Sequence, residues 1–172
     1  VMLTQTLPQD IFYAARFICP YNMSVDGLLI ENTSAADNGE KVRLGIYNEL
    51  AAGYPGSLLA AAAEITLTAA VGLREGAVAS TALVGGTAYW LTMNTNAGTA
   101  WLCYDLTQPD GTANSRSGFA PWGAGVTAVA TTSTGTAGNY IFRAFTYATL
   151  PDPWGTPTTG NSYCPVIGVR EV

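Results

Sequence analysis

The chain of 172 residues contains no histidine, and Lys41 is the only lysine among its seven basic residues. Charged residues make up only 11% of it, whereas about a quarter is usual for soluble domains. Without histidine there can be no Ser-His-Asp triad, no Cys-His nucleophile, no histidine-ligated zinc and no histidine pH switch. The net charge of -5 and the lack of a basic patch argue against nucleic acid as a partner.

Cysteine and long apolar runs are also scarce. Cys19, Cys103 and Cys164 are too far apart for a Cys-x-x-Cys motif, which excludes a zinc ribbon or a thioredoxin-like centre. Each lies among apolar neighbours, so we expect three buried thiols, with one disulfide plus a free thiol as the alternative. No run approaches the roughly 18 apolar residues of a membrane span, and no signal peptide is visible. We therefore expect no membrane insertion.

Short alternating segments separated by glycine, proline, asparagine and aspartate dominate the chain. In residues 41–47, the side chains of Val42, Leu44 and Ile46 share one face, which is typical of a half-buried strand. The spacing of such segments favours a sandwich or a barrel over βαβ units. Strands are predicted at residues 11–17, 23–31, 41–47, 64–68, 72–79, 87–93, 99–106, 126–131, 140–147 and 163–169.

Helix signals are weak. Residues 57–64 contain good helix formers but follow a Tyr-Pro-Gly turn signal, so we expect one helical turn at most, or an extended edge. Gly85 and Gly86 precede a strand and fit a hairpin connection. The strand pattern resumes after every loop, which predicts a single domain over residues 1–172 with an N-terminal arm at 1–10.

Long loops rich in glycine, proline, serine and threonine are predicted at residues 108–125, 131–139 and 150–162. The first and the third contain a tryptophan. A loop tryptophan can stack on the C–H face of a sugar while neighbouring polar groups bind its hydroxyls. Alternatively, the ring pins its loop to the sandwich or packs against another subunit. The candidate residues for sugar or partner contact are Trp122, Trp154, Arg116, Asp110 and Asn114.

The carboxylates give little support for catalysis. Glycoside cleavage needs only two of them at a defined separation, and Asp105 with Asp110 or Asp152 is a conceivable pair. Asp-Gly and Asp-Pro dipeptides are, however, ordinary turn residues. No Asp-x-Asp-x-Asp loop supports a calcium site. We therefore predict no enzymatic activity, no catalytic residues, no metal and no cofactor.

Three motifs follow one another in a fixed order. Residues 42–47 read Val-Arg-Leu-Gly-Ile-Tyr, residues 54–60 read Tyr-Pro-Gly-Ser-Leu-Leu-Ala, and residues 86–91 read Gly-Thr-Ala-Tyr-Trp-Leu. The series resembles a recurring jelly-roll-like β-sandwich domain of tailed-bacteriophage virion proteins. The similarity covers residues 11–97 well and the last ten residues loosely. Within the first motif, Gly45 leaves room for a bulky neighbour such as Trp90.

The resemblance implies a structural role in a tail fibre, a minor tail protein or a head decoration. We accordingly predict an all-β, antiparallel, jelly-roll-like sandwich that is located in the virion and contacts other virion proteins. The low charge suits broad subunit contacts, so we expect a homo-oligomer, and the architecture of such particles suggests a trimer. The alternative hypothesis is a carbohydrate-binding module or receptor-binding tip that uses the loop tryptophans on a host-surface glycan.

Overall fold

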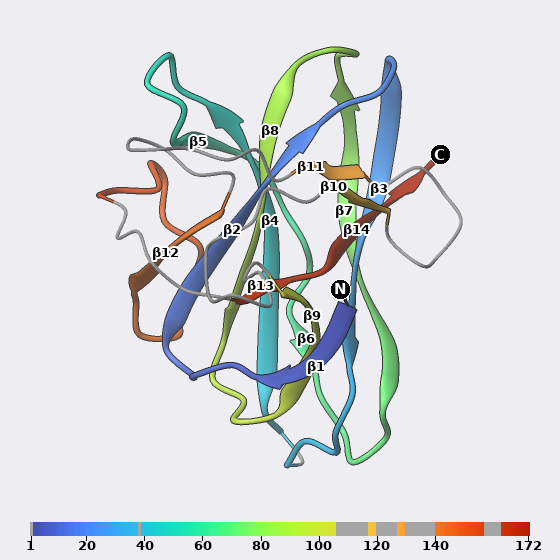
Figure 1. Cartoon of the computed structure of the whole chain (residues 1–172), viewed down its shortest axis with the longest axis vertical. Helices are drawn as coiled ribbons and strands as arrows, with labels where there is room; N and C mark the ends of the chain where they lie inside the picture. Colours follow the sequence, from blue (N-terminus) through green and yellow to red (C-terminus); the bar gives the residue numbers. More distant parts are fainter. Residues whose placement is uncertain (1, 38, 106–116, 120–126, 130–139, 157–162) are drawn as a thin grey trace.

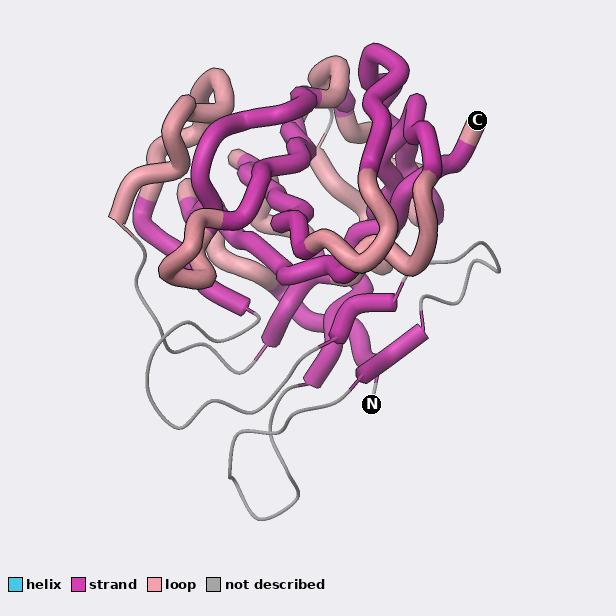
Figure 2. Tube along the Cα trace, turned by 90° about the horizontal axis from the view of Figure 1, so that it is seen from above, coloured by secondary structure: helices cyan, strands magenta, loops and turns pink. Residues whose placement is uncertain are grey.

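The computed structural model describes residues 2–37, 39–105, 117–119, 127–129, 140–156 and 163–172, and their regular structure is all β-strand (Figure 1). Two antiparallel sheets pack together as a β-sandwich, which confirms the predicted fold class. Seen from above, the strands curve around a common interior (Figure 2).

The first sheet contains both ends of the described chain. Its strands β9 and β3 lie in the middle, with β1 and β7 outside them, and two short C-terminal strands pair with β9 and β3. The six strands are β1 (Met2–Thr6), β3 (Met23–Asn32), β7 (Gly72–Leu83), β9 (Ala100–Asp105), β13 (Tyr163–Pro165) and β14 (Ile167–Glu171).

The second sheet is built around the order β2-β8-β4-β5. Strand β12 extends it beyond β2, and β6 pairs with one end of β4. Its eight strands are β2 (Ile11–Ile18), β4 (Lys41–Glu49), β5 (Pro55–Ala61), β6 (Ile65–Thr66), β8 (Ala88–Thr95), β10 (Ser117–Phe119), β11 (Thr127–Val129) and β12 (Tyr140–Ala144).

Among strands β1 to β9, the pairing is nested around the β4–β5 pair. Strand β1 pairs with β9, β2 with β8, β3 with β7, and β4 with β5. Successive strands therefore mostly cross from one sheet to the other, as in a jelly roll, whose eight strands form two Greek keys. The eight main strands are complete at Asp105, and the rest of the chain adds to this frame.

The main core lies between the sheets. On β8 the inward-facing side chains are Tyr89, Leu91 and Met93, whereas Trp90 points to the outer face, as the alternation predicts. Each fully buried Leu, Ile or Met side chain contributes about 1.5–3 kcal/mol to folding. Cys19 and Cys103 are buried free thiols within this core, which confirms the expectation for these two. The side chain of Cys164 lies outside the described part.

The C-terminal strands fill a fork in the first sheet. Strands β9 and β3 pair only where Trp101 faces Asn32. Beyond that point, β13 pairs with β9 and β14 pairs with β3, both antiparallel. Only Val166 separates β13 from β14, which is too short for a hairpin turn, so the chain passes from β9 to β3 with a bend at this residue. The N–H of Val166 donates to the carbonyl of Leu102.

Four expectations about local structure need correction. Residues 57–64 are not helical, because β5 continues through most of them as the extended edge that was the alternative. The arm at 1–10 contains β1, and the loop at 108–125 contains β10. Gly85 and Gly86 do form a turn, but it joins β7 of one sheet to β8 of the other rather than closing a hairpin.

Candidate functional site

The outer face of the second sheet is crossed by residues 145–156, which we call the strap. The strap begins beside β2, where the N–H of Phe145 donates to the carbonyl of Asp10 at 2.9 Å. The side chain of Asn94, buried on β8, then donates to the carbonyl of Phe145 and accepts from the N–H of Ala148. The strap is therefore fixed to the sheet by hydrogen bonds from its first residue onward.

At its far end the strap is fixed to β4 and to the edge strand β5. The hydroxyl of Tyr47 donates to the carbonyl of Pro151 at 2.6 Å. The N–H of Leu58 donates to the Asp152 carboxylate at 3.0 Å, and the N–H of Trp154 donates to the carbonyl of Gly56 at 3.0 Å. These contacts satisfy backbone groups of an edge strand that would otherwise be open to another chain.

A second apolar layer lies between the strap and the sheet. The Trp154 ring stacks on Phe12 with centroids 3.9 Å apart, and it meets the Tyr47 ring edge-on at 5.5 Å. Such aromatic pairs contribute about 0.5–1.5 kcal/mol beyond their buried area. The buried members of this layer are Phe12, Ala14, Tyr47, Trp90, Ile141, Leu150 and Trp154.

Trp154, one of the predicted contact residues, is fully buried in this layer. Its ring pins the strap to the sandwich, which was the structural alternative for this residue. The ring therefore presents no face to a sugar in the described structure.

Gly45 does leave room for a bulky neighbour, but that neighbour is Leu150 rather than Trp90. A Cβ atom at position 45 would lie 2.6 Å from Cδ1 of Leu150. Trp90 instead faces Tyr47 across the β4–β8 pair, and its Nε1 donates to the Glu49 carboxylate at 3.1 Å. The small residue on β4 thus positions the strap.

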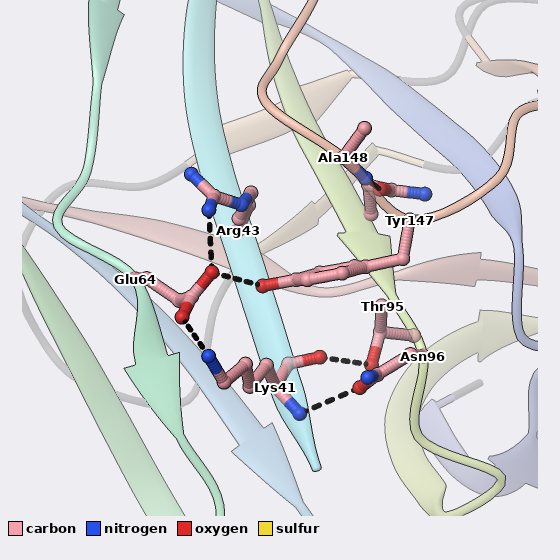
Figure 3. A network of polar contacts seen from close by, with 8 residues as sticks. Lys41, Arg43, Glu64, Thr95, Asn96, Tyr147 and Ala148 are labelled. Carbon is pink, nitrogen blue, oxygen red and sulfur yellow. Dashed lines mark hydrogen bonds and ion pairs between the residues drawn. The ribbon is translucent and has the colours of Figure 1, made fainter.

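A polar network flanks the strap on the β4 side (Figure 3). The Glu64 carboxylate receives Lys41 Nζ at 2.5 Å, Arg43 Nη2 at 2.5 Å and the Tyr147 hydroxyl at 2.9 Å. The hydrogen bond from Lys41 is the main cause that lowers the pKa of Glu64. Burial, followed by the hydrogen bond to Glu64, raises the pKa of Tyr147. The network joins the strap to β4 and to the residue that precedes β6.

Arg143 lies on the other side of the strap, on β12. Its guanidinium carbon is 4.8 Å from the ring centroid of Phe145, 5.6 Å from that of Trp154 and 5.7 Å from that of Phe12. These are cation–π distances. Its Nε is buried and has no hydrogen-bond partner among the residues that the structure describes. Burial lowers the pKa of Arg143.

Sequence reasoning did not single out Arg143. The available signal was an arginine between Phe142 and Phe145, close to Tyr140 and Tyr147, in a segment predicted as a strand. Aromatic residues at alternating positions around a cation indicate a cation held on rings, but they do not identify which rings.

The remaining predicted contact residues, Trp122, Arg116, Asp110 and Asn114, lie outside the described residues. Of the conceivable catalytic carboxylates, Asp152 holds the β5 edge, and the side chain of Asp105 is also outside the described part. Within the described ranges, no three metal-ligating side chains come together, and no helix could cross a membrane.

No protein-family model matches the chain, and no curated protein or solved structure matches it significantly.

Proposed function

We propose that this protein is a non-enzymatic structural subunit of a bacteriophage-like virion, in a tail, a fibre or a capsid decoration. In this role it contacts other virion proteins and its own copies. The observation that carries the proposal is a jelly roll with a charge-poor surface, together with the motif series in residues 42–91.

The distribution of charge supports subunit contacts. Residues 50–63 and 76–104 contain no charged side chain, and they supply β5, β8 and most of β7 and β9. Strand β8 is buried within the fold, but β5 and the uncharged part of β7 have exposed side chains. The cores of protein interfaces are depleted in charged residues, so these exposed side chains suit contact with neighbours. Among the described residues, the large apolar side chains that remain exposed are Tyr21, Leu50, Leu59, Val71, Leu73, Val84 and Val172.

The strap gives the subunit a rigid second sheet. It buries an aromatic layer outside that sheet and fixes the β5 edge, so an assembly contact there would meet a preformed surface. Preformed surfaces lose little conformational entropy on binding.

The test is the presence of the chain in particles. Particles released by the source cells are purified on a density gradient and analysed by quantitative mass spectrometry. We expect the chain to band with the particles in a fixed, symmetric copy number, and antibody against it to label them at regular positions. A chain that stays in the soluble fraction while complete particles band without it would overturn the proposal.

The sugar-binding alternative loses one of its two tryptophans, because Trp154 is buried. Trp122 and the candidate polar groups lie outside the described residues, so no observation favours this alternative, and it is not proposed.

A further inference from the structure

Arg143 stands apart from the other described basic side chains. Each of the others has a partner: Glu49 for Arg16, Glu64 for Lys41 and Arg43, Asp26 and Glu75 for Arg170, and Asn32 for Arg74. For Arg143, no hydrogen bond or ion pair is seen among the described residues.

The guanidinium of Arg143 is nevertheless held in place. Three rings support it, and Gly155 packs beside it with φ +91°, a backbone conformation that favours glycine. A Cβ at Gly155 would lie 2.5 Å from Nη1 of Arg143. The fold thus positions a half-buried cation to which the described part of the chain supplies no acceptor. Such a group gains most from a ligand that brings an acceptor to it.

The geometry of the group selects a carboxylate. A guanidinium presents planar pairs of N–H donors that match the two oxygens of a carboxylate. An acidic saccharide has little ring surface to stack on here, because Phe12 and Trp154 are fully buried and Phe145 is only partly exposed. A protein carboxylate needs only the guanidinium itself.

The chain has such a carboxylate to offer. It has 12 acidic residues against seven basic ones. Asp37, in the exposed connection between β3 and β4, is the one described acidic side chain for which no partner is seen. The nearby hydrogen bond from its N–H to Glu40 involves only its backbone.

We propose that Arg143 binds the Asp37 carboxylate of a second copy of this chain. In an interface with a two-fold axis, each copy's Arg143 meets the other copy's Asp37, whereas a head-to-tail contact closes into a ring when the rotation between copies allows it. The inference rests on the proposed structural role and names a contact within it.

The test is sedimentation of the full chain over a wide range of concentration. We expect the native chain to associate. Arg143→Gln and Asp37→Asn should each lower the association constant about tenfold or more, and added salt should also lower it. Arg170→Gln is the matched control, because it removes the same charge from an ion pair within one copy, and it should leave association unchanged. The exchange of both charges, Arg143→Asp with Asp37→Arg, should restore association.

Thermal unfolding of each variant shows whether it folds. Arg143→Lys serves as a second variant that keeps the positive charge but loses the planar pair of N–H donors. We expect intermediate association from it. A chain that stays monomeric throughout, or an Arg143→Gln variant that associates like the native chain, overturns the inference. With either result, finding the native chain in purified particles would still support the proposed function. Binding of an oligogalacturonate probe by monomers, lost in Arg143→Gln, overturns it in favour of an acidic saccharide.

Discussion

At the residue scale, Gly45 determines where the strap lies. It is a buried position on β4, and the side chain of Leu150 from the strap occupies the space that a side chain at position 45 would fill. The hydroxyl of Thr92 donates to the Gly45 carbonyl, which holds the neighbouring strand at this point. An added methyl group therefore has no free space, because Leu150 is itself buried under the strap.

We expect Gly45→Ala to destabilise the fold by about 1–3 kcal/mol through overpacking against Leu150. Gly98→Ala is the matched control, since a Cβ at Gly98 would meet nothing within 4 Å. Denaturant unfolding of both variants measures the difference. Equal stability of Gly45→Ala and the native protein would show that the strap does not pack into this gap.

Glu64 makes stability depend on pH. Its pKa is lowered in the folded state, first by the hydrogen bond from Lys41. A carboxyl with a lowered pKa adds stability above its unfolded pKa, and this contribution is lost as the pH falls through the folded value. The side chain is one-quarter exposed, so the contribution is on the order of 1 kcal/mol or less.

We therefore expect Glu64→Gln to be less stable than the native protein at neutral pH and to approach it in stability at acidic pH. Urea unfolding at a series of pH values from neutral to strongly acidic tests this. A constant difference between the two proteins across that range would show that the carboxylate charge does not stabilise the fold.

At the element scale, the two additions that follow the eight main strands act differently. The strap covers a sheet face and an edge, whereas β13 and β14 enter the first sheet itself. Ile167 and Val169 on β14 face the main core opposite Ile30 and Leu28. The last residues thus supply both backbone hydrogen bonds and core side chains.

We expect Ile167→Ala to cost about 2–4 kcal/mol, because it leaves a cavity in the main core beside the fork. Val172→Ala is the control at the same end of the chain, where the side chain is 75% exposed, and it should be nearly neutral. Thermal and denaturant unfolding compare the two. A neutral Ile167→Ala would mean that the fork closes without this strand.

The same elements show what could be predicted from the sequence. Strands such as β4 and β8 were predicted, with their inner and outer faces, because burial on one face imposes a period of two. The strap has no such period, since its apolar residues Leu150 and Trp154 lie among prolines. Their positions depend on Gly45 and Phe12, more than 100 residues earlier in the chain. Gly45 indicated a gap, but nothing local indicated which side chain fills it.

At the scale of the whole molecule, the scarcity of charge leaves two kinds of surface. One part of the surface carries ion pairs, such as the contacts of Arg170 with Asp26 and Glu75. The other part, along β5 and the uncharged end of β7, exposes alanine, serine and leucine. A monomer gains nothing from exposing apolar side chains there, whereas a subunit covers them in the assembly.

Leu59 on β5 is 44% exposed, so its side chain contributes little to the folded monomer. We expect Leu59→Lys to change the unfolding free energy by less than about 0.5 kcal/mol. If the proposed role is correct, the variant should be incorporated into particles several-fold less than the native chain, because a lysine in an interface core must be desolvated. Thr146→Lys adds the same charge on the exposed side of the strap and serves as the control. Competition between tagged native and variant chains during particle assembly, quantified by mass spectrometry, measures the ratio. Equal incorporation of all three would place Leu59 outside every subunit contact and leave its exposure without this explanation.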